Sequence, residues 1–361
     1  GYGIQFTKDG KKKYEGQFKD DLKNGYGILY DKNEKPIYEG NFLNEKKNGF
    51  GIEYYIDNKK FYEGEWINNK KNGKGKLYYQ SPNVVQHIGE FFNNKKHGIG
   101  KYYYQNQSIK INGNWEEDLL KYGTEYWENG KEKYQGLFIN NKYSGDACIY
   151  FDNGKICYEG AFKDGYKHGS GTEYNESGKK IYIGEFKHNF KDGFGKLFDN
   201  TSIYEGLFLH NLKSGYGTEY NNNNNKVYIG NYKNDLYHGK GKLYNKTLVY
   251  EGDFENGLFS GLGNQYKNNY LLYEGGFKDG TQHGQGILYF ENCKNILYKG
   301  TFLNNMRDGF GTLYYKNSNI LYRGNWEYNM AHGFGEEYDN NNNLTYSGDW
   351  NYNIKIDKIL Q

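Results

Sequence analysis

The sequence has few of the residues that stabilise most folds. Its 361 residues include only three cysteines, two prolines and two methionines, and its mean hydropathy is −1.05. The cysteines, Cys148, Cys157 and Cys293, are too scattered for a disulfide framework, which favours a reducing, cytosolic setting. No apolar run is long enough to predict a membrane-spanning helix. Neither a disulfide-rich fold nor a helical membrane domain is predicted.

A strong net charge is also missing. The chain has 47 basic and 44 acidic side chains, a formal net charge of +3, which gives no bias toward nucleic acid. Aromatic residues are abundant instead, with 42 tyrosines, 22 phenylalanines and 51 glycines beside them. Low hydropathy alone would predict disorder. We therefore expect aromatic packing to replace the usual aliphatic core.

The aromatic and glycine residues recur in one pattern. Tyr14-Glu15-Gly16-Gln17-Phe18 is followed, nine residues after its glycine, by Gly25-Tyr26-Gly27. A period in this range is typical of a stack of small units, each of which buries its apolar surface against its neighbours. We number fifteen repeats, 22 to 25 residues apart, from the first residue of this pattern, which is Tyr14, Tyr38, Tyr62, His87, Ile111, Tyr134, Tyr158, Tyr182, Tyr204, Tyr228, Tyr250, Tyr273, Tyr298, Tyr322 and Tyr346.

Each repeat has the pattern of a β-hairpin. Tyr38, Gly40 and Phe42 alternate with polar residues and share one face of a predicted strand. The polar residues 44–48 predict the turn, residues 49–55 the second strand and residues 57–60 the connection to the next repeat. The predicted fold is all-β: an elongated, single-layer, twisted antiparallel sheet of about fifteen stacked hairpins.

The presence of three glycines in each repeat requires an explanation, because glycine weakens a strand by about 0.5–1 kcal/mol relative to alanine. We expect them to leave floor space on which aromatic rings from adjacent hairpins lie flat. A turn role suits only the first glycine of the Gly-x-Gly pair. The predicted packing residues are Tyr14, Gly16, Phe18, Gly25, Gly27, Tyr38, Gly40, Phe42, Tyr158, Gly160 and Phe162.

The pattern Tyr-x-Gly-x-Phe, a polar turn and Gly-x-Gly resembles the MORN (membrane occupation and recognition nexus) repeat over essentially the whole chain. The resemblance implies single-layered β-hairpin sheets. The all-repeat layout looks most like the protist cytoskeletal scaffolds of this family, which implies a non-catalytic structural scaffold of a membrane-associated cytoskeletal assembly. Two alternatives stay open: a tether that binds phosphoinositides or other anionic lipids, and a ciliary spoke or adaptor component. No nucleophile and base arrangement predicts an enzyme.

The domain organisation follows the repeats. Residues 1–13 are expected to be the second strand of a truncated repeat, and residues 14–361 one continuous array. The stretch 111–148 departs from the pattern, with Ile111 for tyrosine, Lys121 for the first glycine of repeat 5 and Ala147 for the second glycine of repeat 6.

The last repeat also departs from the pattern, with Asp357 and Ile359 at its Gly-x-Gly positions and apolar residues at alternate positions. An exposed edge strand of this kind invites pairing with another chain. We predict an antiparallel homodimer through the C-terminal repeats, residues 298–361, which the resemblance also implies. The predicted contact residues are Trp326, Trp350, Ile354, Ile356, Ile359 and Leu360.

The predicted partners are therefore the chain itself, cytoskeletal proteins and anionic phospholipids, but not nucleic acid, since the aromatic residues are needed for the core. Lysines in successive turns could contact lipid head groups or an acidic partner, although turn lysines also serve solubility. These candidates are Lys46, Lys47, Lys70, Lys71, Lys95 and Lys96. We expect a cytoplasmic, cytoskeleton-associated protein at the inner face of a membrane.

No cofactor is predicted. His283, Cys293 and His332 lie in the predicted dimer region and could share a zinc ion between chains, although they lack the usual CxxC or HxxxH spacing.

Overall fold

The computed structural model describes residues 1–81 and 83–356 and divides into two compact units. Unit 1 comprises residues 1–189, and unit 2 begins at Phe190. All regular elements of the described residues are β-strands. The predicted all-β class is therefore confirmed. Pro82, Asp357, Ile359 and Leu360 lie outside the described residues.

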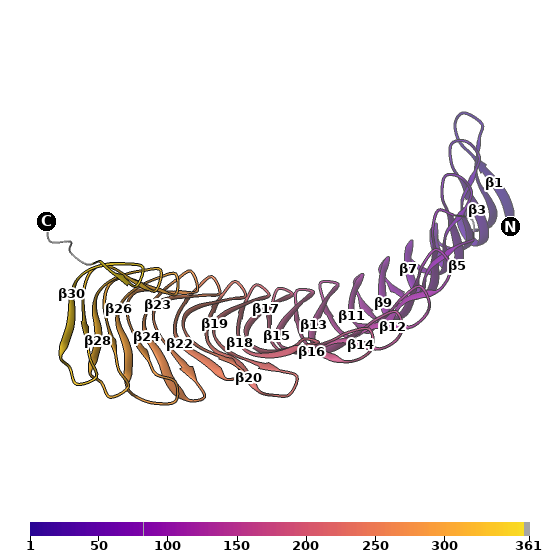
Figure 1. The fold of residues 1–361 in the computed structure, drawn as a ribbon. Coiled ribbons are helices and arrows are strands. Elements are labelled where there is room, and N and C mark those ends of the chain that lie inside the picture. The colour runs from indigo at the N-terminus through magenta and orange to yellow at the C-terminus, as the bar shows by residue number, and fades with distance from the viewer. Residues whose placement is uncertain (82, 357–361) are drawn as a thin grey trace. The chain divides into compact units, whose positions relative to one another are not determined.

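Unit 1 contains sixteen strands, which follow one another in chain order (Figure 1). They are β1 (Tyr2–Phe6), β2 (Lys12–Lys19), β3 (Leu22–Tyr30), β4 (Pro36–Leu43), β5 (Lys46–Tyr54), β6 (Lys60–Ile67), β7 (Lys70–Tyr78), β8 (Val85–Phe92), β9 (Lys95–Tyr103), β10 (Ile109–Glu116), β11 (Leu119–Tyr126), β12 (Glu132–Ile139), β13 (Lys142–Tyr150), β14 (Ile156–Lys163), β15 (Tyr166–Tyr174) and β16 (Lys180–Lys187).

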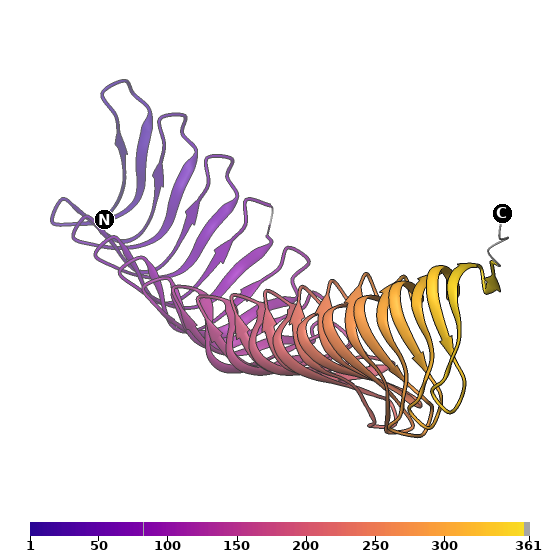
Figure 2. The same cartoon turned by 60° about the vertical axis from the view of Figure 1, so that its left-hand side comes forward.

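Unit 2 contains fifteen strands, and Figure 2 shows the same succession from another side. They are β17 (Phe190–Phe198), β18 (Ser202–Leu209), β19 (Leu212–Asn221), β20 (Lys226–Lys233), β21 (Leu236–Asn245), β22 (Leu248–Glu255), β23 (Leu258–Lys267), β24 (Tyr270–Lys278), β25 (Thr281–Tyr289), β26 (Ile296–Leu303), β27 (Met306–Tyr314), β28 (Ile320–Glu327), β29 (Met330–Tyr338), β30 (Leu344–Asn351) and β31 (Ile354–Lys355).

Within each unit, every strand pairs antiparallel with the next strand of the chain. The pairs run from β1–β2 to β15–β16 in unit 1 and from β17–β18 to β30–β31 in unit 2. Each unit is thus an open antiparallel sheet of one layer, as predicted. Because no second layer covers the sheet, the rings on its own surface must form the core.

The turn inside each hairpin is shorter than predicted. In repeat 2 only Asn44 and Glu45 leave the strands, both with positive φ, at 48° and 68°. Two such residues form the turn whose twist matches that of the flanking strands, and asparagine tolerates this conformation. The predicted turn 44–48 is therefore wrong, because residues 46–48 belong to β5.

A bulge in the second strand explains one of the glycine positions that recur from repeat to repeat. Gly40 pairs with Gly51 and Phe42 with Lys47, so that three residues of β5 face Asn41 alone. Gly49 lies in this bulge with a φ of 92°. A left-handed residue in a bulge favours glycine, since a side chain would be strained there.

Candidate protein-interaction site

One face of the sheet, which we call the ring face, carries the aromatic core. The Tyr14 side chain is fully buried, and its hydroxyl donates to the carbonyl oxygen of Gln17 at 3.0 Å. Its ring covers Gly16 and Gly27: a Cβ atom added to Gly27 would lie 2.2 Å from the Tyr14 hydroxyl oxygen. The glycine floor therefore carries the tyrosine of its own repeat, and not rings from adjacent hairpins.

The other predicted packing residues repeat this arrangement, except for one glycine. Tyr38 covers Gly40, and Tyr158 covers Gly160. Gly25 instead has a φ of 92°, and its added Cβ would meet the Gln17 side chain. The predicted floor role is therefore wrong for Gly25, which is a bulge glycine.

Neighbouring rings of the row stand edge to face with one another. The Tyr14 centroid lies 5.2 Å from Phe18 of its own repeat and 5.3 Å from Phe42 of the next, at interplanar angles of 87° and 88°. Tyr158 lies between Phe162 and Phe186 in the same way. Such pairs contribute about 0.5–1.5 kcal/mol beyond burial. Each tyrosine therefore ties two repeats together.

Lysines cover the exposed side of these rings. The Lys47 ammonium lies 4.5 Å from the ring centroids of Tyr38 and Trp66, and 3.0 Å from a carboxylate oxygen of Glu53. Lys71 also pairs with Glu53, at 3.0 Å. Burial lowers the pKa of Lys71, and the Glu53 carboxylate opposes this effect. The arrangement combines cation–π contact with a partly buried ion pair.

Aromatic residues replace the lysine in some repeats. Tyr143 stacks on Tyr134 with centroids 3.8 Å apart, and Phe259 stacks on Tyr250 at the same distance. A cation or a second ring therefore covers the tyrosine in these repeats, whereas Gln282 and Ala331 occupy this position in repeats 12 and 14.

This arrangement changes the predicted lysine edge. Adjacent residues of a strand point to opposite sides, so that Lys47, Lys71 and Lys96 face the rings. The other lysine of each pair is exposed, and these are Lys46, Lys70 and Lys95. The predicted edge of six lysines is therefore wrong, because only Lys46, Lys70 and Lys95 are exposed, and Lys95 forms an ion pair with Glu117.

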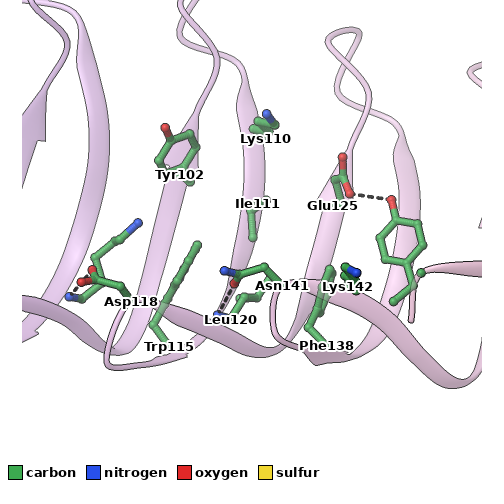
Figure 3. Close-up of a pocket in the computed structure, with 13 residues that line it drawn as sticks. Tyr102, Lys110, Ile111, Trp115, Asp118, Leu120, Glu125, Phe138, Asn141 and Lys142 are labelled. Carbon is green, nitrogen blue, oxygen red and sulfur yellow. Dashed lines mark hydrogen bonds between the residues drawn. The ribbon is translucent and has the colours of Figure 1, made fainter. Parts of the chain in front are cut away.

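The ring row is interrupted at repeat 5, where Ile111 takes the place of the tyrosine. The two flanking rings, Trp115 and Phe138, are present and buried, with 6% and 5% exposed. Leu120, in the lysine position, covers part of the floor: its Cδ1 atom lies 2.7 Å from a Cβ added to Gly113. What remains is an open hollow of about 570 Å³, the repeat 5 hollow (Figure 3).

Charged and polar side chains surround the repeat 5 hollow (Figure 3). Glu125 accepts hydrogen bonds from the Tyr143 hydroxyl at 2.6 Å and from the Lys133 ammonium at 2.9 Å. The Asn141 amide oxygen accepts from the backbone nitrogen of Leu120 at 2.9 Å. Burial, with the Glu125 carboxylate, raises the pKa of Tyr143. The anionic groups at the hollow therefore already have partners.

The strands of repeat 5 are also irregular. Asn114 pairs with Tyr122 and Trp115 with Leu120, which leaves Lys121 as a bulge of one residue without a positive φ. Sequence reasoning marked Ile111 and Lys121 as departures but did not find the hollow. The signal in the sequence was Ile111, an aliphatic residue at a position that the other repeats fill with an aromatic ring.

His87 replaces the tyrosine of repeat 4. Its ring is fully buried and lies edge to face with Phe91 and Trp115, each at 5.6 Å. Neither ring nitrogen has a hydrogen-bond partner among the described residues. Burial, helped by the Lys96 charge, lowers the pKa of His87 to about 3. The imidazole is therefore neutral at physiological pH.

The opposite face of the sheet, which we call the open face, exposes a second apolar row. It consists of the apolar residues at the middle position of the Gly-x-Gly segments and of Tyr122, which occupies this position in repeat 5. Polar residues interrupt the row in repeats 3, 6, 7, 10 and 12, where this position is Lys74, Asp146, Ser170, Lys240 and Gln285. In unit 1 the apolar side chains of the row are 48% to 71% exposed and include Tyr26, Phe50, Ile99 and Tyr122. In unit 2 they are 52% to 69% exposed and include Phe194, Tyr216, Leu262, Phe310 and Phe334.

Carboxylates line the same face. Glu39 accepts a hydrogen bond from the Tyr54 hydroxyl at 2.9 Å and another from Tyr26. The bond to Glu39 and burial raise the pKa of Tyr26 to about 12. An open hollow of about 720 Å³ lies nearby, with Phe50 and Ile99 in its wall.

The predicted dimer residues divide into buried and exposed ones. Trp326 and Trp350 occupy the phenylalanine position of the ring row, with 6% and 7% exposed. Their indole nitrogens donate to backbone carbonyls at 3.2 and 3.3 Å. They are therefore core residues of their own chain, and the expectation that they form a contact surface is wrong. Ile354 and Ile356 are 68% and 48% exposed, while Ile359 and Leu360 lie outside the described residues.

No metal site forms among the described residues of the chain. His283, Cys293 and His332 are not gathered into a cluster that could hold zinc. All three cysteines are free thiols. The Cys293 thiol donates a hydrogen bond to the Phe290 carbonyl oxygen at 3.8 Å. The described residues also include no helix that could cross a membrane.

The comparison with protein families decides the identity of the array. The MORN repeat model matches residues 14–34, 38–60, 62–81, 87–109, 158–180, 182–201, 204–226, 228–246, 250–270, 273–292, 298–320 and 322–344. The chain belongs to the MORN repeat family. MORN repeats generally mediate interaction with membranes or proteins, and MORN repeat proteins are typically non-enzymatic scaffolds. Among curated proteins, the comparison finds no match.

The matched segments omit residues 110–157 of the MORN array. These include Ile111, Lys121 and Ala147, the departures from the repeat pattern. The repeat 5 hollow therefore lies where the chain is least typical of its family.

Proposed function

We propose that this MORN protein is a non-catalytic scaffold that binds protein partners along the open face of its sheet. The apolar row between the glycine pairs is the observation that carries this proposal. A protein rarely exposes large apolar side chains repeatedly on one face unless they contact a partner. Because several hairpins of each unit carry such a side chain, each unit offers the same contact several times, which strengthens binding without any new kind of contact.

A partner recovery experiment tests this role. The intact chain is compared with a variant that changes Phe194, Tyr216, Phe310 and Phe334 to serine. These side chains are about half exposed, so that the variant should fold. We expect the intact chain to recover protein partners from its native cell and the variant to lose them. A matched control changes the exposed lysines Lys226 and Lys233 to serine. Equal recovery by the intact chain and both variants would contradict the proposal.

We further propose that two chains associate through the C-terminal edge and that the assembly belongs to a membrane-associated cytoskeletal structure of the cytoplasm. Ile354 and Ile356 support the first part, because they are exposed beside the edge strand β31. Light scattering should give a dimer for the intact chain and a monomer after both are changed to lysine. A monomeric intact chain would show that this edge does not pair. Fluorescence microscopy of the tagged protein tests its location, including a cilium as the alternative.

A second candidate is contact with an anionic membrane. Lys46, Lys70 and Lys95 favour it, because they occupy the exposed position beside successive hairpin turns. Each lysine near an anionic surface contributes about 1 kcal/mol. Changing the three to serine should abolish co-sedimentation with anionic vesicles, whereas changing Lys74, Lys76 and Lys101, which lie farther from the hairpin turns, should not. Retained sedimentation after the first change would reject this candidate.

A further inference from the structure

The repeat 5 hollow has the walls for an aromatic ring but lacks the ring. In repeats 1 to 3 the tyrosine lies between two rings, with centroids 5.1 to 5.4 Å apart. Trp115 and Phe138 are the two rings that flank the same space in repeat 5. Ile111 and Leu120 together cover only part of it. An aromatic side chain supplied from outside would complete the row.

A lysine whose ammonium forms no ion pair among the described residues stands beside this space. The Lys96 ammonium lies 4.5 Å from the Trp115 ring centroid. Lysines at this position elsewhere pair with a carboxylate: Lys23 with Glu45, Lys47 and Lys71 with Glu53, Lys167 with Glu173, and Lys213 with Glu219.

Lys96 lacks such a pair because both candidate partners are altered. Tyr102 stands where the glutamate would be. Asp118, shorter by one methylene than Glu45 of repeat 2, bonds the backbone nitrogen of Lys96 at 2.9 Å. Within residues 1–81 and 83–356, no carboxylate forms an ion pair with the Lys96 ammonium. Burial lowers the pKa of Lys96, and the Asp118 carboxylate opposes this effect only in part, so that a second negative charge in contact with the ammonium would be favourable.

Two more lysines line the hollow. The Lys110 ammonium lies 5.4 Å from the Tyr104 ring, and Lys142 is exposed. Neither forms an ion pair within the described part of the chain. Since Glu125 is already engaged by Lys133 and Tyr143, the charge that remains available at the hollow is positive.

We propose that the repeat 5 hollow binds an acidic peptide segment of a protein partner. The segment inserts one phenylalanine, tyrosine or tryptophan side chain between Trp115 and Phe138 and places a carboxylate beside Lys96. This inference rests on the proposed function as a protein-binding scaffold and names the kind of partner that repeat 5 selects. The ring gains edge-to-face contacts, and the carboxylate supplies the counter-charge.

A phosphate ligand fits the hollow less well. Asp118 and Glu125 both line it, and two carboxylates oppose a group that carries two negative charges. The Asn141 amide oxygen is bonded to the backbone of Leu120, so that it is not free to pair with a nucleobase. A ligand with one carboxylate and one aromatic ring fits better, because the carboxylate can contact Lys96 and the ring can lie between Trp115 and Phe138.

The test selects phage-displayed random peptides on the intact chain and on the double variant Ile111→Tyr, Leu120→Lys. The variant restores the two residue types of the regular repeats and should fill the hollow. We expect peptides selected on the intact chain to contain an aromatic residue next to aspartate or glutamate. These peptides should fail to bind the variant, with thermal unfolding of both proteins as the check of folding.

The charge is tested by Lys96→Gln against Lys95→Gln. Lys95 is the neighbouring exposed lysine, whose ammonium pairs with Glu117 at 3.2 Å. A synthetic copy of a selected peptide should bind the Lys96 variant about threefold to tenfold more weakly than the intact chain, and the Lys95 variant unchanged. Equal weakening by both variants would overturn the role of Lys96.

Other outcomes reject the proposal and distinguish it from the scaffold function. Peptides that bind the intact chain and the filled variant equally would remove the hollow from the interaction but leave protein binding intact. Absence of any selected peptide would overturn the hollow as a peptide site; continued recovery of protein partners by the open face would still support the scaffold. Anionic vesicles or free nucleotides that bind the intact chain but not the filled variant would replace the peptide with a phosphate ligand.

Discussion

Repeats 2 and 5 are both hairpins with a two-residue turn, and they differ in the bulge of the second strand and in the side chains over the glycine floor. In repeat 2 Tyr38 fills the space between two rings, and Lys47 covers it with its charge satisfied by Glu53. In repeat 5 isoleucine and leucine take these two positions, while the flanking rings remain. The array therefore tolerates the loss of the tyrosine ring in repeat 5, because the neighbouring repeats hold its strands in place.

The largest difference should appear when the two positions are truncated. Tyr38→Ala removes a fully buried ring with a hydrogen bond to the Asn41 carbonyl at 3.1 Å, and should cost about 3–5 kcal/mol of unfolding free energy. Ile111→Ala removes a half-buried side chain beside an existing hollow, and should cost only about 1–2 kcal/mol. Chemical denaturation of both variants measures this, and equal losses would contradict the comparison.

Repeat 4 adds a pH dependence that repeat 2 lacks. The pKa of His87 is about 3 in the folded chain, below its ordinary value of 6.5, so that the unfolded chain binds the proton more readily. Stability from this group is therefore complete above pH 6.5 and falls by about 1.4 kcal/mol per pH unit as the pH drops toward 3. At about pH 4.5 the loss should reach about 2–3 kcal/mol.

His87→Tyr should remove this part of the pH dependence. Unfolding free energies at about pH 7.5 and about pH 4.5, compared between the two proteins, isolate the histidine from the many carboxylates, which are common to both. The same decrease in both proteins would show that the buried imidazole is not the cause.

A smaller effect separates the two lysines of a pair. Lys47→Ala removes contacts to Tyr38, Trp66 and Glu53 and should cost about 1–2 kcal/mol. Lys46→Ala, on the exposed side of the same strand, should stay within about 0.5 kcal/mol. Thermal or chemical unfolding of the two single variants gives the answer; a reversed order would place the wrong lysine on the rings.

The smallest effect should come from restoring repeat 5. Ile111→Tyr alone should destabilise the chain, because Leu120 already covers the floor at Gly113. Together with Leu120→Lys, the new ring should gain about 0.5–1.5 kcal/mol from its contacts with Trp115 and Phe138. A double-mutant cycle measures the coupling between the two positions. Additive effects would mean that Leu120 does not compete for the space of the missing ring.

The sequence by itself determined the all-β class and the hairpin as the unit. These follow from local chemistry, since alternation within a strand and the spacing of glycines act inside one repeat. It misjudged the hairpin turn, because a polar run such as residues 44–48 does not show which residues take a positive φ.

Only the tertiary structure decided what depends on neighbouring repeats. Lys46 and Lys47 are chemically alike, and the register of β4 and β5 determines that Lys47 alone lies over the rings. The repeat 5 hollow has Trp115 of one hairpin and Phe138 of the next as its walls. The space between them exists because β10 and β12 lie on either side of β11 with one ring missing, and a pattern within one repeat does not contain that information.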